Sequence, residues 1–156
     1  LKYPKHVLAL GLFSTAAGRT KDDREKILAV IKSMEKQGVS EVLPTLIDRW
    51  FTDSFISSSP DIIERRIQQV INTDPEIFMN VFRIYANTEM GPWLHKINFP
   101  TLILTGEKDG GCNPKLNKFI ADQIPNSKLV ILPNYKHSLL IETPNEIAEN
   151  IINFFN

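Results

Sequence analysis

The chain has 156 residues, of which 42% are hydrophobic and 23% charged, and its 18 Lys and Arg residues balance 18 Asp and Glu residues. A neutral chain without a basic stretch lacks the positive surface by which proteins bind nucleic acid or an anionic membrane, so neither partner is expected. The composition is that of an ordinary globular protein.

The first residues combine two lysines, a short apolar run over 7–13 and small side chains over 14–17, a pattern that imitates a signal peptide. The run is too short to favour that interpretation, and no stretch reaches the ~20 apolar residues of a membrane helix. The single cysteine, Cys112, cannot form an internal disulfide. We therefore expect a cytoplasmic protein.

The apolar run over 7–13 predicts a strand buried on both faces that ends in the small residues 14–18. The chain starts at Leu1, without Met, a few residues before this strand. We therefore expect the downstream part of a longer protein, whose upstream half completes the fold. Without those neighbours the strand keeps an open edge, so we expect residues 1–156 alone to be poorly stable or to self-associate, and a homo-oligomer is one expected state.

Residues 21–96 show no convincing strand and several helical patterns. Apolar side chains at helical spacing predict at least four amphipathic helices. They cover residues 27–34, closed by Gly38; residues 40–51; a segment opened by Ser59-Pro60; and a segment opened by Asp74-Pro75. Pro44 fits the second helix only in its first turn. We interpret this block as an insertion at the carboxyl edge of a sheet, where it forms a lid over a site.

Two further apolar runs, 101–105 and 128–132, predict buried strands near the C-terminus. Between them Asn113-Pro114 opens a helix, so the unit is strand, helix, strand and the two strands are expected to be parallel. A last helix is predicted from Thr143-Pro144, where Thr143 and Glu146 have the spacing of a capping box. The fold class is therefore α/β, with parallel strands and flanking helices.

Titratable residues follow both of these strands. Asp109 lies in the loop after the first strand and His137 in the loop after the second. Parallel strands lie ~4.8 Å apart and their carboxyl ends share one edge, so such loops can bring a carboxylate to an imidazole. An Asp that orients a His is the base half of an acyl-transfer triad. The plain alternative is a loop carboxylate and an unrelated surface histidine.

Several stretches resemble the C-terminal part of the α/β-hydrolase superfamily, and the resemblance covers essentially the whole chain. These are Pro100-Thr101-Leu102-Ile103-Leu104-Thr105-Gly106-Glu107-Lys108-Asp109, Pro114, Ile124-Pro125-Asn126-Ser127, His137 and Glu142-Thr143-Pro144. Residues 49–55 and 73–76 resemble the 3-oxoadipate enol-lactonase branch. The resemblance implies a partial α/β-hydrolase fold with a core strand and loop over 1–18, an all-helical cap over 19–97, and a C-terminal βαβα part of the core over 98–156.

The same resemblance implies that Asp109 is the triad acid and His137 the general base. No Gly-x-Ser-x-Gly occurs in the chain, so the nucleophile and oxyanion hole are expected upstream, and the chain alone is expected to be inactive. The implied protein is a serine esterase or lactonase acting on a small carboxylic ester or lactone, without a cofactor. Two alternatives stay open: a non-catalytic ligand-binding or interaction protein of the same fold, and, with an upstream Asp nucleophile, dehalogenase or epoxide hydrolase chemistry.

Four aromatic residues, Trp50, Phe51, Phe55 and Trp93, are candidates for lining a substrate pocket, and packing within the cap is an equal alternative. Arg19 and Arg49 could hold a substrate carboxylate, although an exposed surface arginine is the commoner role.

Cys112 invites a Cys-His-Asp interpretation because it shares a loop with Asp109. Its loop is not the strained strand-to-helix turn that holds such a nucleophile, so a free thiol, buried or half-exposed, is expected. The three histidines have no ligand spacing, and no metal is expected.

Overall fold

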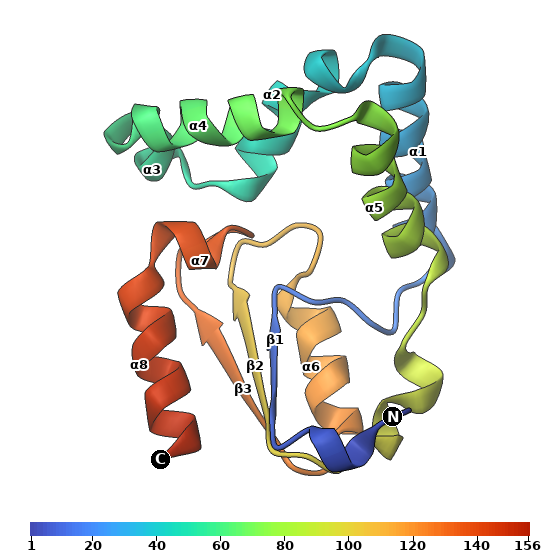
Figure 1. Ribbon diagram of the computed structural model, residues 1–156, viewed down its shortest axis with the longest axis vertical. Helices are drawn as coiled ribbons and strands as arrows, with labels where there is room; N and C mark the ends of the chain where they lie inside the picture. Colours follow the sequence, from blue (N-terminus) through green and yellow to red (C-terminus); the bar gives the residue numbers. More distant parts are fainter. The chain divides into compact units, whose positions relative to one another are not determined.

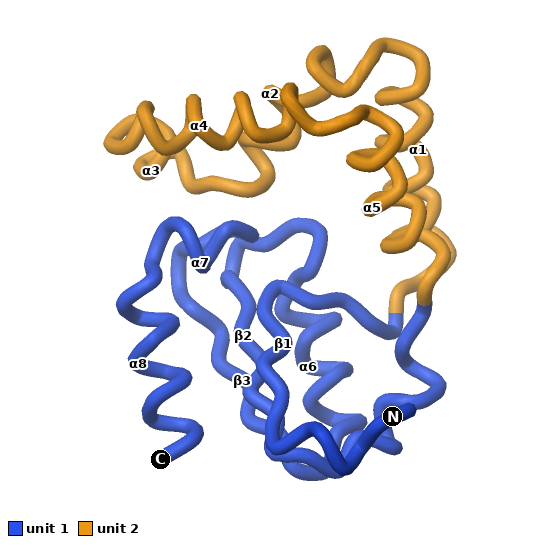
Figure 2. The backbone as a smooth tube through the Cα atoms, viewed as in Figure 1, with its two compact units in different colours: residues 1–18, 89–156 blue, residues 19–88 orange.

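The computed structural model describes residues 1–156, which form two compact units (Figure 2). Unit 1 contains residues 1–18 and 89–156, and unit 2 contains residues 19–88. The sequence placed the end of the helical block at residue 97, whereas in the structure residues 89–97 belong to unit 1. They do so because Leu94 and Ile97 pack against Ile103 and Ile120 in its core.

A three-stranded parallel sheet forms the centre of unit 1 (Figure 1). Strand β1 (Leu10–Phe13) pairs with β2 (Thr101–Gly106), which pairs with β3 (Ser127–Leu132). All six residues of the central strand β2 are buried. The parallel α/β architecture predicted from the sequence is therefore confirmed.

Helices cover both faces of this sheet. On one face Ile103 packs with Ile120 of helix α6 (Pro114–Gln123). On the other face Leu102 and Leu104 pack with Ile147 of helix α8 (Pro144–Phe155), and with Leu139 of the short helix α7 (Leu139–Glu142). Successive side chains of a strand point to opposite faces, which is why an unbroken apolar run suits the central strand.

The first strand is shorter and more exposed than predicted. The sequence indicated a strand over 7–13 buried on both faces, but β1 has four residues, and Leu8 lies outside it with 90% of its surface exposed. A short 3₁₀ turn, η1 (Pro4–His6), precedes it. Strand β1 pairs on one side only, with β2, and its strand residues are the four that take part in that ladder.

The two helix starts predicted in unit 1 differ in how they are capped. At α6 the side chain of Asn113 accepts a 3.1 Å hydrogen bond from the N–H of Leu116, as the sequence indicates. Helix α8 begins at Pro144 as predicted, but Thr143 makes no side-chain cap. Its hydroxyl instead donates to Glu146 at 3.2 Å, so the predicted capping box is not formed.

Unit 2 is entirely helical and has five helices, one more than the minimum of four predicted. They are α1 (Lys21–Gln37), α2 (Val39–Trp50), α3 (Asp53–Ser58), α4 (Pro60–Ile71) and α5 (Pro75–Asn87). The additional helix, α3, has only six residues. Pro44 lies inside α2 beyond its first turn, contrary to the prediction. Gly38, with φ of 91°, ends α1 and lets α2 begin at the next residue.

The ends of unit 2 connect to unit 1 at Gly18 and Glu89. One carboxylate oxygen of Glu89 accepts hydrogen bonds from the N–H of Gly18, at 2.9 Å, and from the N–H of Gly91, at 2.8 Å. Gly91 begins the 3₁₀ helix η2 (Gly91–Lys96). None of the helices has the length and the apolar character needed to span a bilayer.

Candidate active site

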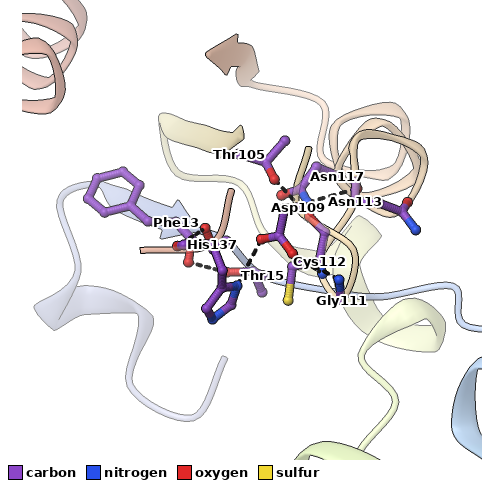
Figure 3. Close-up of polar contacts among 10 residues, drawn as sticks. Phe13, Thr15, Thr105, Asp109, Gly111, Cys112, Asn113, Asn117 and His137 are labelled. Atoms are coloured by element: carbon purple, nitrogen blue, oxygen red, sulfur yellow. Dashed lines mark hydrogen bonds and ion pairs between the residues drawn. The ribbon is translucent and has the colours of Figure 1, made fainter. Parts of the chain in front are cut away.

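The two titratable residues that follow β2 and β3 meet at the edge of the sheet. Nδ1 of His137 lies 2.8 Å from Oδ2 of Asp109 (Figure 3). The side chain of Asp109 is 1% exposed, whereas that of His137 is 37% exposed. The carboxylate is therefore shielded, and the imidazole reaches solvent.

The loop after β2 fixes the carboxylate of Asp109. Its second oxygen, Oδ1, accepts hydrogen bonds from the backbone N–H groups of Gly111, at 2.9 Å, and Cys112, at 2.8 Å. A short polar side chain that binds the backbone two and three residues on is typical of such turns. These bonds leave Oδ2 to face the imidazole.

Two buried polar side chains, one in β2 and one in α6, also bind the backbone of this loop. The carbonyl oxygen of Cys112 accepts hydrogen bonds from the hydroxyl of Thr105, in β2, and from the amide of Asn117, in α6, each at 2.7 Å. Thr105 and Asn117 are both fully buried. The loop that carries Asp109 is thus tied to a strand and to a helix of the core.

The loop after β3 packs closely against the end of β2. A Cβ atom added at Gly106 would lie 2.7 Å from the carbonyl carbon of Tyr135, and closer still to the carbonyl oxygens of residues 135 and 136. The N–H of Lys108 donates to the Tyr135 carbonyl at 2.8 Å, and the N–H of Asn134 donates to Glu107 at 2.9 Å. Only glycine leaves room for this approach.

The residue that follows β1 also contacts this loop. The hydroxyl of Ser14 donates to the carbonyl oxygen of His137 at 2.9 Å. Ser14 has a φ of 46°, in the left-handed region that is unfavourable for residues with a Cβ atom. The position of His137 is therefore fixed by all three strands of the sheet.

The two side chains stabilise each other's charged form. Burial opposes ionisation of Asp109, but hydrogen bonds from His137, Cys112 and Gly111 lower the pKa of its carboxyl below 3.8. Burial likewise opposes the charge of His137, but its contacts with Asp109 and Cys112 raise the pKa of the imidazole to about 10. A carboxylate and an imidazolium therefore face each other at neutral pH.

The four aromatic residues singled out in the sequence lie in different places. Phe51 is fully buried in the core of unit 2, and its ring stacks on that of Phe55 with centroids 5.7 Å apart. Trp50 and Phe55 are partly buried against the same core. Trp93 belongs to η2 in unit 1 and is partly exposed.

The two arginines also differ in their surroundings. The guanidinium of Arg19 donates to the carbonyl oxygens of Tyr85 and Thr88 and lies 4.5 Å from the centre of the Tyr85 ring. Arg19 thus holds the C-terminal end of α5. Arg49 is exposed at the end of α2.

Three residues that hold the site were not identified from the sequence: Ser14, Gly106 and Asn117. Ser14 is the first polar residue after an apolar run, and Asn117 is an amide next to the apolar Leu116 of a predicted helix. Both are recognisable signals in retrospect. The need for glycine at 106 depends on a loop 30 residues away, so no local pattern indicates it.

Comparisons with known proteins agree on one fold. No protein-family model matches the chain. It is 27% identical over 126 residues to 3-oxoadipate enol-lactonase 2 of Acinetobacter baylyi, a match covering 79% of this chain and 47% of that protein. The chain spans about half the length of the curated relatives it matches.

Solved structures match nearly the whole chain, and two of them illustrate the likeness. The enol-lactonase from Burkholderia xenovorans LB400 has a TM-score of 0.87 at 19% identity, with 97% of this chain and 58% of that one covered. The α/β hydrolase MGS-M2, from a deep-sea metagenome library, has a TM-score of 0.82 at 20% identity, with 99% and 58% covered. At these identities the structures show the fold, and the resemblance noted in the sequence to the enol-lactonase branch is confirmed by the curated relatives.

Proposed function

We propose that this chain, which has the α/β-hydrolase fold, is the C-terminal portion of a serine hydrolase that acts on a small carboxylic ester or lactone. In this proposal Asp109 is the triad acid and His137 the general base. The observation that carries it is the 2.8 Å contact between Oδ2 of Asp109 and Nδ1 of His137 at the ends of adjacent parallel strands. The curated similarity to enol-lactonases supports the substrate class.

The geometry suits the two roles. Asp109 binds Nδ1 of His137, so Nε2 is the atom that takes a proton from a nucleophilic hydroxyl and later returns it to the leaving oxygen. Both half-reactions pass through an imidazolium, and the buried carboxylate stabilises that charge. The two backbone donors to Asp109 keep the carboxylate in place while the proton moves.

The nucleophile and the oxyanion hole belong, in this proposal, to a segment outside these 156 residues. The chain contains no Gly-x-Ser-x-Gly, and it spans about half the length of its curated relatives. Residues 1–156 alone are therefore expected to be inactive. No metal or organic cofactor takes part in the proposed reaction.

Helical unit 2 is proposed as the cap that shapes the substrate pocket. Trp50 and Phe55 of unit 2, and Trp93 of unit 1, keep part of their surface exposed and remain candidates for contacting an acyl group. Phe51 is fully buried, so in this proposal it supports its neighbour Phe55 rather than meeting substrate directly.

The test is labelling of the full-length gene product by a fluorophosphonate, which reacts with an activated serine. We expect labelling, and expect His137→Gln to slow it by about 10³-fold or more, because loss of the base leaves only the remaining catalytic groups. His95→Gln, which removes an exposed imidazole in the same unit, is the control and should label normally. Unchanged labelling of His137→Gln would overturn the assignment of the base.

Two further readouts separate the proposal from a non-catalytic binding protein. Hydrolysis of small p-nitrophenyl esters and small lactones is expected for the full-length protein, and none is expected for residues 1–156. The raised pKa of His137 means that the imidazole must lose a proton before it accepts one, so the labelling rate should increase with pH through the alkaline range. A full-length protein that neither labels nor hydrolyses any ester would support the binding protein instead.

A further inference from the structure

Beside the paired carboxylate and imidazole lies a third side chain that the proposed hydrolysis does not use. Cys112 is 5% exposed, is the only cysteine in the chain, and forms no disulfide. One ligand atom each from Asp109, Cys112 and His137 fall within 4.8 Å of one another. Figure 3 shows the sulfur next to the carboxylate and the imidazole ring.

The three groups are held in place by the surrounding structure. Oδ1 of Asp109 is fixed by two backbone N–H groups, so Oδ2 is the oxygen presented to the cluster. The carbonyl of Cys112 is fixed by Thr105 and Asn117, each at 2.7 Å. Second-shell hydrogen bonds of this kind orient the side chains that bind a metal.

We propose that Asp109, Cys112 and His137 form a binding site for a borderline-soft divalent cation, with Zn²⁺ as the preferred ion. The ligands are the Cys112 thiolate, a ring nitrogen of His137 and Oδ2 of Asp109. Water takes the fourth position, on the side where the imidazole is exposed. This site goes beyond the proposed hydrolase function and does not depend on it.

The donor set is the reason for choosing zinc. Sulfur, imidazole nitrogen and carboxylate oxygen together suit Zn²⁺, whereas Mg²⁺ and Ca²⁺ prefer oxygen alone. The thiolate and the carboxylate neutralise the two positive charges. On binding, the thiol proton of Cys112 leaves to solvent. The proton between Nδ1 of His137 and Oδ2 of Asp109 also leaves, because the metal then binds both of these atoms.

The required movement is small. With zinc bonds of about 2.0–2.3 Å, ligand atoms around a tetrahedral ion lie roughly 3.3–3.7 Å apart. The 2.8 Å distance between Nδ1 of His137 and Oδ2 of Asp109 must therefore increase slightly. Ligand atoms that lie as much as 4.8 Å apart must approach each other by about 1 Å. The partly exposed His137 ring can adjust its distances to the other two ligand atoms, and rotation of the Cys112 side chain about its Cα–Cβ bond can adjust the distance between its Sγ and Oδ2 of Asp109.

A bound ion would have a direct consequence for the proposed hydrolase. The metal replaces the hydrogen bond that orients His137, and the imidazole can no longer serve as a base. Zn²⁺ should therefore act as an inhibitor that competes with the acid–base pair rather than as a cofactor.

The first experiment titrates the protein with Co²⁺ and then with Zn²⁺. A thiolate bound to Co²⁺ gives a charge-transfer band in the near ultraviolet, and Cys112 is the only cysteine among residues 1–156, so loss of the band in Cys112→Ala assigns it to this residue. We expect one Co²⁺ per chain, displaced by one Zn²⁺. The Cys112→Ala variant should lose the band and bind Zn²⁺ at least about 100-fold more weakly, since loss of outer-shell groups alone costs up to that factor.

The matched control is His95→Gln, which removes an exposed histidine of unit 1 and should bind as the unaltered protein does. His137→Gln and Asp109→Asn should each weaken Zn²⁺ binding. Absence of the charge-transfer band, or unchanged Zn²⁺ affinity in Cys112→Ala, would overturn the site.

A second measurement needs no variant and so does not depend on whether a variant folds. Zn²⁺ should slow alkylation of Cys112 by iodoacetamide in the unaltered protein, and Mg²⁺ at the same concentration should not. Equal alkylation rates with and without Zn²⁺ would overturn the proposal. Because neither measurement requires turnover, failure of the metal site is distinguishable from failure of the hydrolase assignment.

Discussion

The hydroxyl of Ser14 donates a 2.9 Å hydrogen bond to the backbone carbonyl of His137, 123 residues further along the chain. Ser14 immediately follows β1 and adopts a left-handed backbone conformation to do so. The contact joins an edge strand of the sheet to the loop that carries the imidazole. The placement of His137 therefore depends on a residue in the first tenth of the sequence.

Replacing Ser14 should show what this contact contributes. Ser14→Ala removes the hydroxyl but keeps the unfavourable φ, so we expect a loss of about 1 kcal/mol in the free energy of unfolding, measured with urea. Ser14→Gly should be less destabilising, because glycine relieves the backbone cost while losing the same bond. Ser57→Ala, which removes an exposed hydroxyl bonded to the Asp53 carbonyl, is the control. Equal stability of Ser14→Ala and the unaltered protein would contradict the prediction.

A methyl group at position 106 should displace the loop that carries His137. Gly106→Ala places a Cβ atom against the carbonyl groups of Tyr135 and Lys136, so we expect about 1–3 kcal/mol of destabilisation. The imidazole NMR signals of His137 should also shift, because the loop can no longer approach β2. Gly110→Ala, where the added Cβ meets nothing within 4 Å, should be close to neutral. If both variants behaved alike, the close approach would not be the cause.

The buried amide of Asn117 should contribute to the stability of the protein through its hydrogen bond to the Cys112 carbonyl. Asn117→Ala removes one of the two side-chain donors to the Cys112 carbonyl and opens a cavity in the core, so we expect the free energy of unfolding to fall by about 2–3 kcal/mol. Asn150→Ala removes a 2.8 Å bond within α8 and should cost less. Thermal unfolding of the two variants side by side is the measurement, and a smaller loss for Asn117→Ala would argue against the role of the loop anchor.

The paired charges predict how stability depends on pH. The raised pKa of His137 contributes stability that is complete below the unfolded value of 6.5 and is lost as pH rises through about 10. The lowered pKa of Asp109 contributes stability that is present above 3.8 and is lost as pH falls through the lower folded value. The advantage of the unaltered protein over Asp109→Asn/His137→Gln should therefore be largest between about pH 4.5 and 6.5.

That difference is measured by urea unfolding at several pH values. It should shrink as the pH rises towards 10 and again as the pH falls below 3.8. A difference that is constant across this range would mean that the contact between the two side chains contributes no charge-dependent stability. His95→Gln serves to show the effect of removing a histidine elsewhere in the same unit.

The central part of unit 1 could be predicted because its signals are local. The run over 101–105 and the cap at Asn113 each determine their own element, and parallel pairing then brings the loops with Asp109 and His137 to one edge. The site follows from the order of the elements along the chain. No side-chain geometry was needed to propose it.

The features that the sequence did not predict depend on tertiary contacts rather than on local patterns. The apolar run over 7–13 looks like a full buried strand, yet only the four residues that face β2 become one. The sequence predicts that Pro44 fits a helix only in its first turn, but packing of Val42, Leu43 and Leu46 in the core of unit 2 keeps it inside α2. The convergence of Cys112 on the paired side chains depends on a turn whose shape is set by Asp109 itself.

The carboxylate of Glu89 holds the entry and exit of the helical unit together, since it binds the N–H of Gly18 on one side and that of Gly91 on the other. Both bonds lie within unit 1, as do the bonds that Ser14, Thr105 and Asn117 make to the loops carrying Asp109 and His137. The two connections of unit 2 to unit 1 are thus joined by hydrogen bonds that involve no residue of unit 2. Exchange of residues 19–88 for another helical segment should therefore leave these two hydrogen bonds of Glu89 intact.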